Sequence, residues 1–127
     1  MTHRRVFVDH LTIRVADLER SRAFYVAALA PLAVLVLEVP ERGEVTFGPP
    51  GAEDFAIAEG SPPSGPFHLA FLAASRQEVD AFHAAAIAAG GVDNGAPGPR
   101  PQYHPGYYGA YVLDPDGNNV EVVNHNR

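Results

Sequence analysis

Apolar and polar residues alternate along Val6–Val15, a pattern typical of a half-buried β-strand. One face of this strand is apolar, and the other carries His10, Thr12 and Arg14. A row of polar residues on one face of a strand lines either solvent or a polar cleft. Arg14 shares its face with His10, so it is a candidate for holding an anionic group of a substrate.

A helix is expected after this strand, with Asp17 as its N-cap and an apolar stripe along one side. The same strand-then-helix pattern returns 58 residues later. His10–Leu29 aligns without a gap on His68–Ile87, with seven identities. Repeated units of this kind predict two pseudo-symmetric halves in which His10 and His68 occupy equivalent positions.

The rest of the first half predicts further strands separated by turns rich in Gly and Pro. The strand candidates are Leu32–Val39, Glu44–Phe47 and Asp54–Glu59. Gly60–Pro66 is the linker-like stretch that separates the two halves, so module 1 covers about residues 1–60 and module 2 about residues 66–127.

In the second half, Ser75 opens a capping box for the second helix, which Gly90 and Gly91 end. The strands Tyr107–Leu113 and Asn118–Asn124 are joined by a strong hairpin turn signal, Asp-Pro-Asp-Gly. Between the second helix and this hairpin, the segment 91–106 is rich in Gly and Pro and lacks periodicity.

Long aperiodic segments in small domains are usually functional loops or disordered. We therefore interpret this one as a lid over a pocket. The lid and the strand after it carry the candidate substrate contacts: Arg100, Tyr103, His104, Tyr107 and Tyr111.

A chain of 127 residues with 46% hydrophobic residues is expected to form one domain, residues 1–127. The net charge of −6 argues against nucleic acid or an anionic membrane surface as a partner. The chain has no cysteine, which excludes thiolate metal sites and fits a reducing cytoplasm. It also has no apolar run of transmembrane length.

Glu121 lies in the middle of the last strand, between two valines on the opposite face. A buried carboxylate requires a partner, because burying it unpaired costs several kcal/mol. With His10 and His68 it offers two imidazoles and a carboxylate. This ligand set suits a divalent ion of Fe, Mn, Ni, Co or Zn and leaves positions open for water or substrate.

Three segments resemble the vicinal oxygen chelate superfamily, the glyoxalase, bleomycin-resistance and extradiol-dioxygenase group. They are Asp9–Ile13, His68–Phe71 and Leu113–Glu121, the last with its Asp-Pro-Asp-Gly-Asn turn. The resemblance implies an α+β fold of two βαβββ modules. These form a half-open, eight-stranded, barrel-like sheet around a cleft, with the helices outside.

The resemblance also implies a divalent ion on His10, His68 and Glu121, and a homodimer. The site is either within one chain or shared between two chains. The expected function is that of a metal-dependent lyase, isomerase or dioxygenase acting on a small, oxygen-rich substrate. Glu121, His104 and Tyr103 are the expected catalytic residues, which orient the substrate or move protons.

The chain departs from glyoxalase I at the position of a fourth ligand, a glutamate in that enzyme. Strand alternation places Phe55 or Ala56 there, and neither can bind a metal. This difference argues against a lactoylglutathione lyase activity, although His104 could supply a fourth ligand. The alternative is a metal-free protein that sequesters a drug or metabolite, like the bleomycin-resistance proteins. Retention of all three ligand residues speaks against that alternative.

Overall fold

The structure is a computed structural model that describes residues 9–49, 52–62 and 67–126. The first half contains β1 (Leu11–Val15), α1 (Leu18–Leu29), β2 (Leu35–Val39), β3 (Glu44–Gly48) and β4 (Phe55–Glu59), with short 3₁₀ helices at Ala30–Leu32 and Pro40–Arg42. The second half contains β5 (His68–Leu72), α2 (Arg76–Ala88), β6 (Val92–Pro99), β7 (Tyr108–Leu113) and β8 (Asn119–Asn124).

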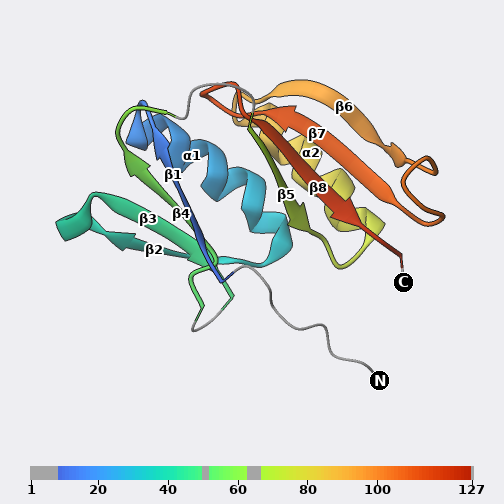
Figure 1. The fold of residues 1–127 in the computed structure, drawn as a ribbon, viewed down its shortest axis with the longest axis horizontal. Coiled ribbons are helices and arrows are strands. Elements are labelled where there is room, and N and C mark those ends of the chain that lie inside the picture. The colour runs from blue at the N-terminus through green and yellow to red at the C-terminus, as the bar shows by residue number, and fades with distance from the viewer. Residues whose placement is uncertain (1–8, 50–51, 63–66, 127) are drawn as a thin grey trace.

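Each half forms its own four-stranded mixed sheet, in the orders β1-β4-β3-β2 and β5-β8-β7-β6. In both sheets the first strand pairs in parallel with the last strand of its half, and the remaining pairs are antiparallel. This confirms the α+β architecture of two βαβββ modules. The two sheets do not close into one barrel, and Figure 1 shows α1 between β1 and β5.

Side-chain caps begin both helices where the sequence predicts them. The Asp17 carboxylate accepts a hydrogen bond from the backbone N–H of Arg20 at 3.1 Å. The Ser75 hydroxyl accepts one from Glu78 N–H at 3.1 Å, and the Glu78 carboxylate accepts one from Ala74 N–H at 2.9 Å. These contacts satisfy amide groups that the first helical turn leaves without partners.

The two modules are joined through their helices and a shared aromatic core. α1 packs against α2, and each helix also packs on a strand of its own sheet. Phe55 of module 1 and Phe71 of module 2 meet edge to face, with ring centroids 5.2 Å apart. The helices therefore cover one face of each sheet, and the polar faces point away from this core.

Two predictions about the strands are wrong. Half of the predicted loop 91–106 is the strand β6, which pairs with β7 through an irregular register. The predicted strand Leu32–Val39 begins only at Leu35, because a 3₁₀ turn and Ala33 in the left-handed region (φ 58°) precede it. Residues 6–8 of the first predicted strand and 63–66 of the predicted linker lie outside the described residues.

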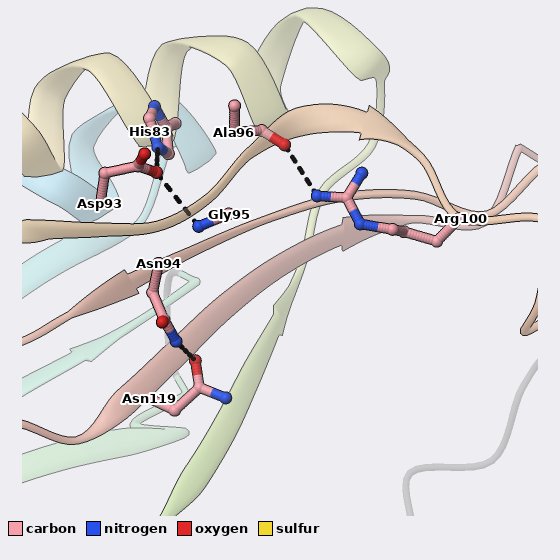
Figure 2. Close-up of polar contacts among 7 residues, drawn as sticks. All are labelled: His83, Asp93, Asn94, Gly95, Ala96, Arg100 and Asn119. Atoms are coloured by element: carbon pink, nitrogen blue, oxygen red, sulfur yellow. Dashed lines mark hydrogen bonds and ion pairs between the residues drawn. The ribbon is translucent and has the colours of Figure 1, made fainter.

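Figure 2 shows how side chains hold β6 in place although its sequence lacks apolar alternation. His83 of α2 bonds the Asp93 carboxylate at 2.9 Å, and this carboxylate also accepts the Gly95 N–H at 3.1 Å. The His83 contact lowers the pKa of Asp93, so this carboxylate stays ionised in mildly acidic solution. Asn94 donates to the Asn119 side chain of β8 at 3.1 Å. These contacts fix a strand that backbone propensity alone does not specify.

A buried hydrogen bond crosses from module 1 to the hairpin turn of module 2. The Tyr25 hydroxyl donates to Asp114 at 2.6 Å, and burial together with Asp114 raises the pKa of Tyr25. Asp114 also accepts N–H groups of Asp116 and Asn118 within its own turn. Gly117 closes that turn at φ 82°, a left-handed conformation that favours glycine. The Asp-Pro-Asp-Gly-Asn segment therefore links the modules as well as the strands β7 and β8.

Tyr25→Phe is expected to lower the free energy of unfolding by about 2 kcal/mol, because it leaves a buried carboxylate without one of its donors. The matched control is Tyr108→Phe, which removes an exposed hydroxyl bond to Asp80 and is expected to cost less than about 0.5 kcal/mol. Urea unfolding of both variants measures the difference. Equal losses of unfolding free energy in the two variants would show that the buried bond between Tyr25 and Asp114 contributes no more than the exposed one.

Candidate functional site

The polar face of the second sheet gathers most of the predicted site residues. The register places Ala70 of β5, Glu121 of β8 and Tyr111 of β7 in one row across this sheet. His68 begins β5 on the same face, two residues before Ala70. The small side chain of Ala70 leaves room beside Glu121, and the His68 ring reaches the glutamate from the end of the strand.

Glu121 is only 2% exposed and has two side-chain partners. His68 Nε2 lies 2.8 Å from Oε1, and the Tyr107 hydroxyl donates to Oε2. The prediction that this buried carboxylate has partners is confirmed. His68 itself remains half exposed, with 54% of its side chain accessible, so solvent reaches the pair from one side.

The two tyrosines beside Glu121 are held in their protonated form. Burial and the Glu121 carboxylate raise the pKa of Tyr107 well above its usual value near 10. The same causes raise the pKa of Tyr111 to about 12. An ionised phenol would place a second negative charge beside Glu121 in a poorly hydrated position. Both hydroxyls therefore stay protonated at neutral pH, and that of Tyr107 donates to Glu121.

The segment after β6 adds the remaining predicted residues of this face. The Arg100 guanidinium lies over the Tyr111 ring at 5.5 Å and donates to the Ala96 carbonyl at 2.8 Å, as Figure 2 shows for the second contact. The Tyr103 ring lies 4.9 Å from that of Tyr107. His104 Nε2 lies 2.9 Å from His125 Nδ1. These contacts form a continuous cluster around Glu121.

His10 and Arg14 lie on the polar face of the other sheet. His10 lines a cavity of about 510 Å³ whose walls are formed entirely by residues 9–56 of module 1. Its Nδ1 is 2.8 Å from the Asp9 carboxylate. The Arg14 side chain passes over Gly60, where a Cβ would come within 3.1 Å of Arg14 Cδ. The chain thus places the two equivalent histidines on different sheets.

Among residues 9–49, 52–62 and 67–126, no three His, Asp or Glu side chains are clustered closely enough to hold a metal ion. Two of the predicted ligands, His68 and Glu121, are spaced so that both could bind the same ion. Neighbouring donor atoms bonded at about 2.1 Å to an octahedral ion lie about 3 Å apart, and His68 Nε2 and Glu121 Oε1 are separated by 2.8 Å. The donor chemistry suits a divalent ion, and the third donor must come from elsewhere.

The register identifies the module 1 counterpart of Glu121. Ala70 pairs with Glu121, and its repeat equivalent Thr12 pairs with Ala56. Of the two residues expected at this position, Ala56 is therefore the counterpart, and it offers no ligand. Phe55 lies in the core.

His125 is a member of this cluster for which the sequence predicts no role. Glu121 and His125 are four residues apart along one strand and its extension, so alternation places them on the same face. That alternation was the available signal. Nothing in the sequence indicated that His104, 21 residues earlier, would meet it.

The chain matches the family model of the Glyoxalase/Bleomycin resistance protein/Dioxygenase superfamily over residues 7–122. The protein belongs to this superfamily.

Solved structures of the superfamily share the whole fold. A glyoxalase/bleomycin resistance protein from Albidiferax ferrireducens T118 is 33% identical, with a TM-score of 0.78, and the match covers 91% of this chain and 96% of that one. A glyoxalase/bleomycin resistance protein/dioxygenase family enzyme from Burkholderia phytofirmans PsJN is 23% identical, with a TM-score of 0.70 and coverage of 94% and 98%. A glyoxalase-related enzyme from Fulvimarina pelagi is also 23% identical, with a TM-score of 0.69 and coverage of 93% and 87%.

The comparison with curated proteins finds no match. In the part of the chain that the structure describes, no helix is long and apolar enough to cross a membrane.

Replacing Glu121 by Gln in chelator-treated protein is expected to lower the pKa values of Tyr107 and Tyr111, because the nearby negative charge is removed while burial remains. An absorbance titration of tyrosinate formation measures this change. Asp80→Asn is the control, since it lowers only the pKa of Tyr108, which its bond to Asp80 raises. An unchanged curve for Glu121→Gln would contradict the electrostatic role of Glu121.

Proposed function

We propose that this superfamily member is a divalent-metal-dependent enzyme of the lyase, isomerase or dioxygenase type. Its substrate is a small, oxygen-rich molecule. His10, His68 and Glu121 hold the ion. The observation that carries this proposal is the 2.8 Å approach of His68 Nε2 to the buried Glu121 carboxylate on an open sheet face.

His10 comes from a second copy of the chain. It lies on the polar face of module 1, whereas His68 and Glu121 lie on that of module 2. The shared helical core holds these faces apart within one chain. In a homodimer, module 1 of one copy can face module 2 of the other and bring His10 to the pair. Two equivalent sites then form per dimer, as two-fold symmetry requires.

Charge supports this pairing of faces. The cavity around His10 is lined by four carboxylates, those of Asp9, Glu44, Glu53 and Asp54, and by one cation, Arg42. The module 2 face carries Arg100 and three imidazoles around its single glutamate. Because the acidic face of module 1 would repel a second copy of itself, this association is favoured over the pairing of like faces.

A divalent ion bound here would polarise a carbonyl or enediolate oxygen of the substrate. The side chains around this position have different roles. Tyr107 donates to Glu121 Oε2 and so leaves Oε1 on the side of His68. The Tyr107 hydroxyl thereby orients the carboxylate, with Oε1 as the oxygen that would hold the ion beside His68.

The remaining residues orient the substrate. Tyr111 and Tyr103 offer ring faces beside the glutamate, and Arg100 places a cation over Tyr111 at 5.5 Å. His104 lies at the rim of the same cluster. In the dimer, Arg14 would face this cluster from the other sheet and contribute a second cation for an anionic group of the substrate.

Protein prepared without a His-tag is expected to contain one divalent ion per chain. His10→Ala, His68→Ala and Glu121→Gln should each lower the affinity for added Zn²⁺ or Mn²⁺ by at least about 100-fold, since each removes a direct ligand. Metal analysis and isothermal titration measure both quantities. Acidification should also release the ion, because protonated imidazoles cannot bind it.

His83→Ala is the matched control, because its ring bonds Asp93 on β6 and lies outside the proposed ligand set. Equal metal binding by all four variants would refute the assignment. Binding of a drug or metabolite that survives chelator treatment, with no metal uptake, would instead identify a metal-free binding protein.

A further inference from the structure

Two histidines outside the proposed ligand set of His10, His68 and Glu121 meet beside the cluster. His104 lies in the loop between β6 and β7, and His125 directly follows β8. Their ring planes are nearly parallel, with an interplanar angle of 23° and centroids 5.2 Å apart. His104 Nε2 and His125 Nδ1 lie 2.9 Å apart.

The hydrogen-bond pattern determines which nitrogen carries each proton. His104 Nδ1 lies 2.7 Å from the carbonyl oxygen of Pro105, and a carbonyl can only accept. Nδ1 of His104 must therefore be protonated, so Nε2 of the neutral ring is an acceptor. His125 Nδ1 is then the donor in the bond between the rings. The two side chains thus form a directed pair rather than a mere stack.

Both histidines of the pair contact the Tyr107 ring. The Tyr107 ring packs edge to face against both imidazoles, with centroid distances of 5.4 Å to each. At its other end, the Tyr107 hydroxyl donates to Glu121. Together with the Tyr103 ring at 4.9 Å, these contacts restrict the directions in which the Tyr107 ring can present its hydroxyl.

The backbone supports the same arrangement. Arg100 N–H donates to the Tyr107 carbonyl at 2.8 Å and closes the loop. Gly106 has φ 92°, and a Cβ there would come within 3.0 Å of the His125 carbonyl oxygen. The loop therefore approaches the end of β8 closely at the point where the histidines meet.

We propose that His104 and His125 are positioning residues whose hydrogen bond holds the Tyr107 hydroxyl on Glu121 and so fixes the orientation of this carboxylate toward His68. The proposal rests on the proposed function for its consequence in metal binding. The placement of Tyr107 can be tested without metal.

The test compares variants that remove the hydrogen bond between His104 and His125 with variants that keep a donor or an acceptor at the same place. His125→Ala and His104→Ala remove the bond. His125→Asn keeps a donor nitrogen at the same number of bonds from Cα, and His104→Gln keeps an acceptor oxygen at the position of Nε2. His125→Phe keeps the ring but loses the donor.

The readout is the NMR resonance of the Tyr107 ζ-carbon in metal-free protein labelled at tyrosine, assigned with Tyr107→Phe. In His104→Ala, His125→Ala and His125→Phe, the resonance should move to its position in Glu121→Gln, where the acceptor charge is absent. In His104→Gln and His125→Asn it should stay at the wild-type position, as it should in the control His83→Ala. Thermal unfolding confirms that each variant is folded.

An unmoved resonance in both alanine variants would overturn the proposal. So would a wild-type resonance in His125→Phe together with a displaced one in His125→Asn, since ring packing alone would then hold Tyr107. Zn²⁺ affinity should fall about 10–100-fold in the alanine variants and recover in the conservative ones. A wild-type protein that takes up no metal would refute the proposed function while leaving the NMR result to decide this proposal.

Discussion

The packing of α1 against α2 determines what the rest of the molecule can do. Both helices lie on the inner faces of their sheets, and aromatic rings from the two modules fill the space between them. The polar faces of the sheets must then point away from this shared core. The bond from Tyr25 to Asp114 ties the hairpin turn of module 2 to α1 and holds this arrangement. A cleft bounded by both polar faces therefore requires a second chain.

Pseudo-symmetry is preserved in the framework and broken in the chemistry. His10 and His68 begin equivalent segments. The position in module 1 that is equivalent to Glu121, however, is occupied by Ala56. Module 2 concentrates the tyrosines and the additional histidines around one buried carboxylate. Module 1 supplies a histidine at the edge of a roomy, acidic cavity. The two faces therefore carry different groups and are not two copies of one site.

The helices and most strands could be predicted because their signals are local. Asp17 and Ser75 cap helices within three or four residues of sequence. The internal repeat predicts the same strand and helix in both modules. The strand β6 could not be predicted, since partners distant in sequence, such as His83 for Asp93, compensate for its glycines and prolines. That the buried Glu121 carboxylate requires hydrogen-bond partners was predictable from the sequence, and Tyr107 and His68 are these partners.

The meeting of His104 with His125 and the separation of His10 from His68 depend on how distant segments pack, which no local pattern encodes. The central claim is that one site combines His10 of one copy with His68 and Glu121 of another. Refolding His10→Ala together with Glu121→Gln tests it most directly through the metal content of the mixture. Random pairing should restore about a quarter of the wild-type content, because half of the dimers then contain one intact site. A mixture that binds no more metal than the separate variants would contradict a shared site.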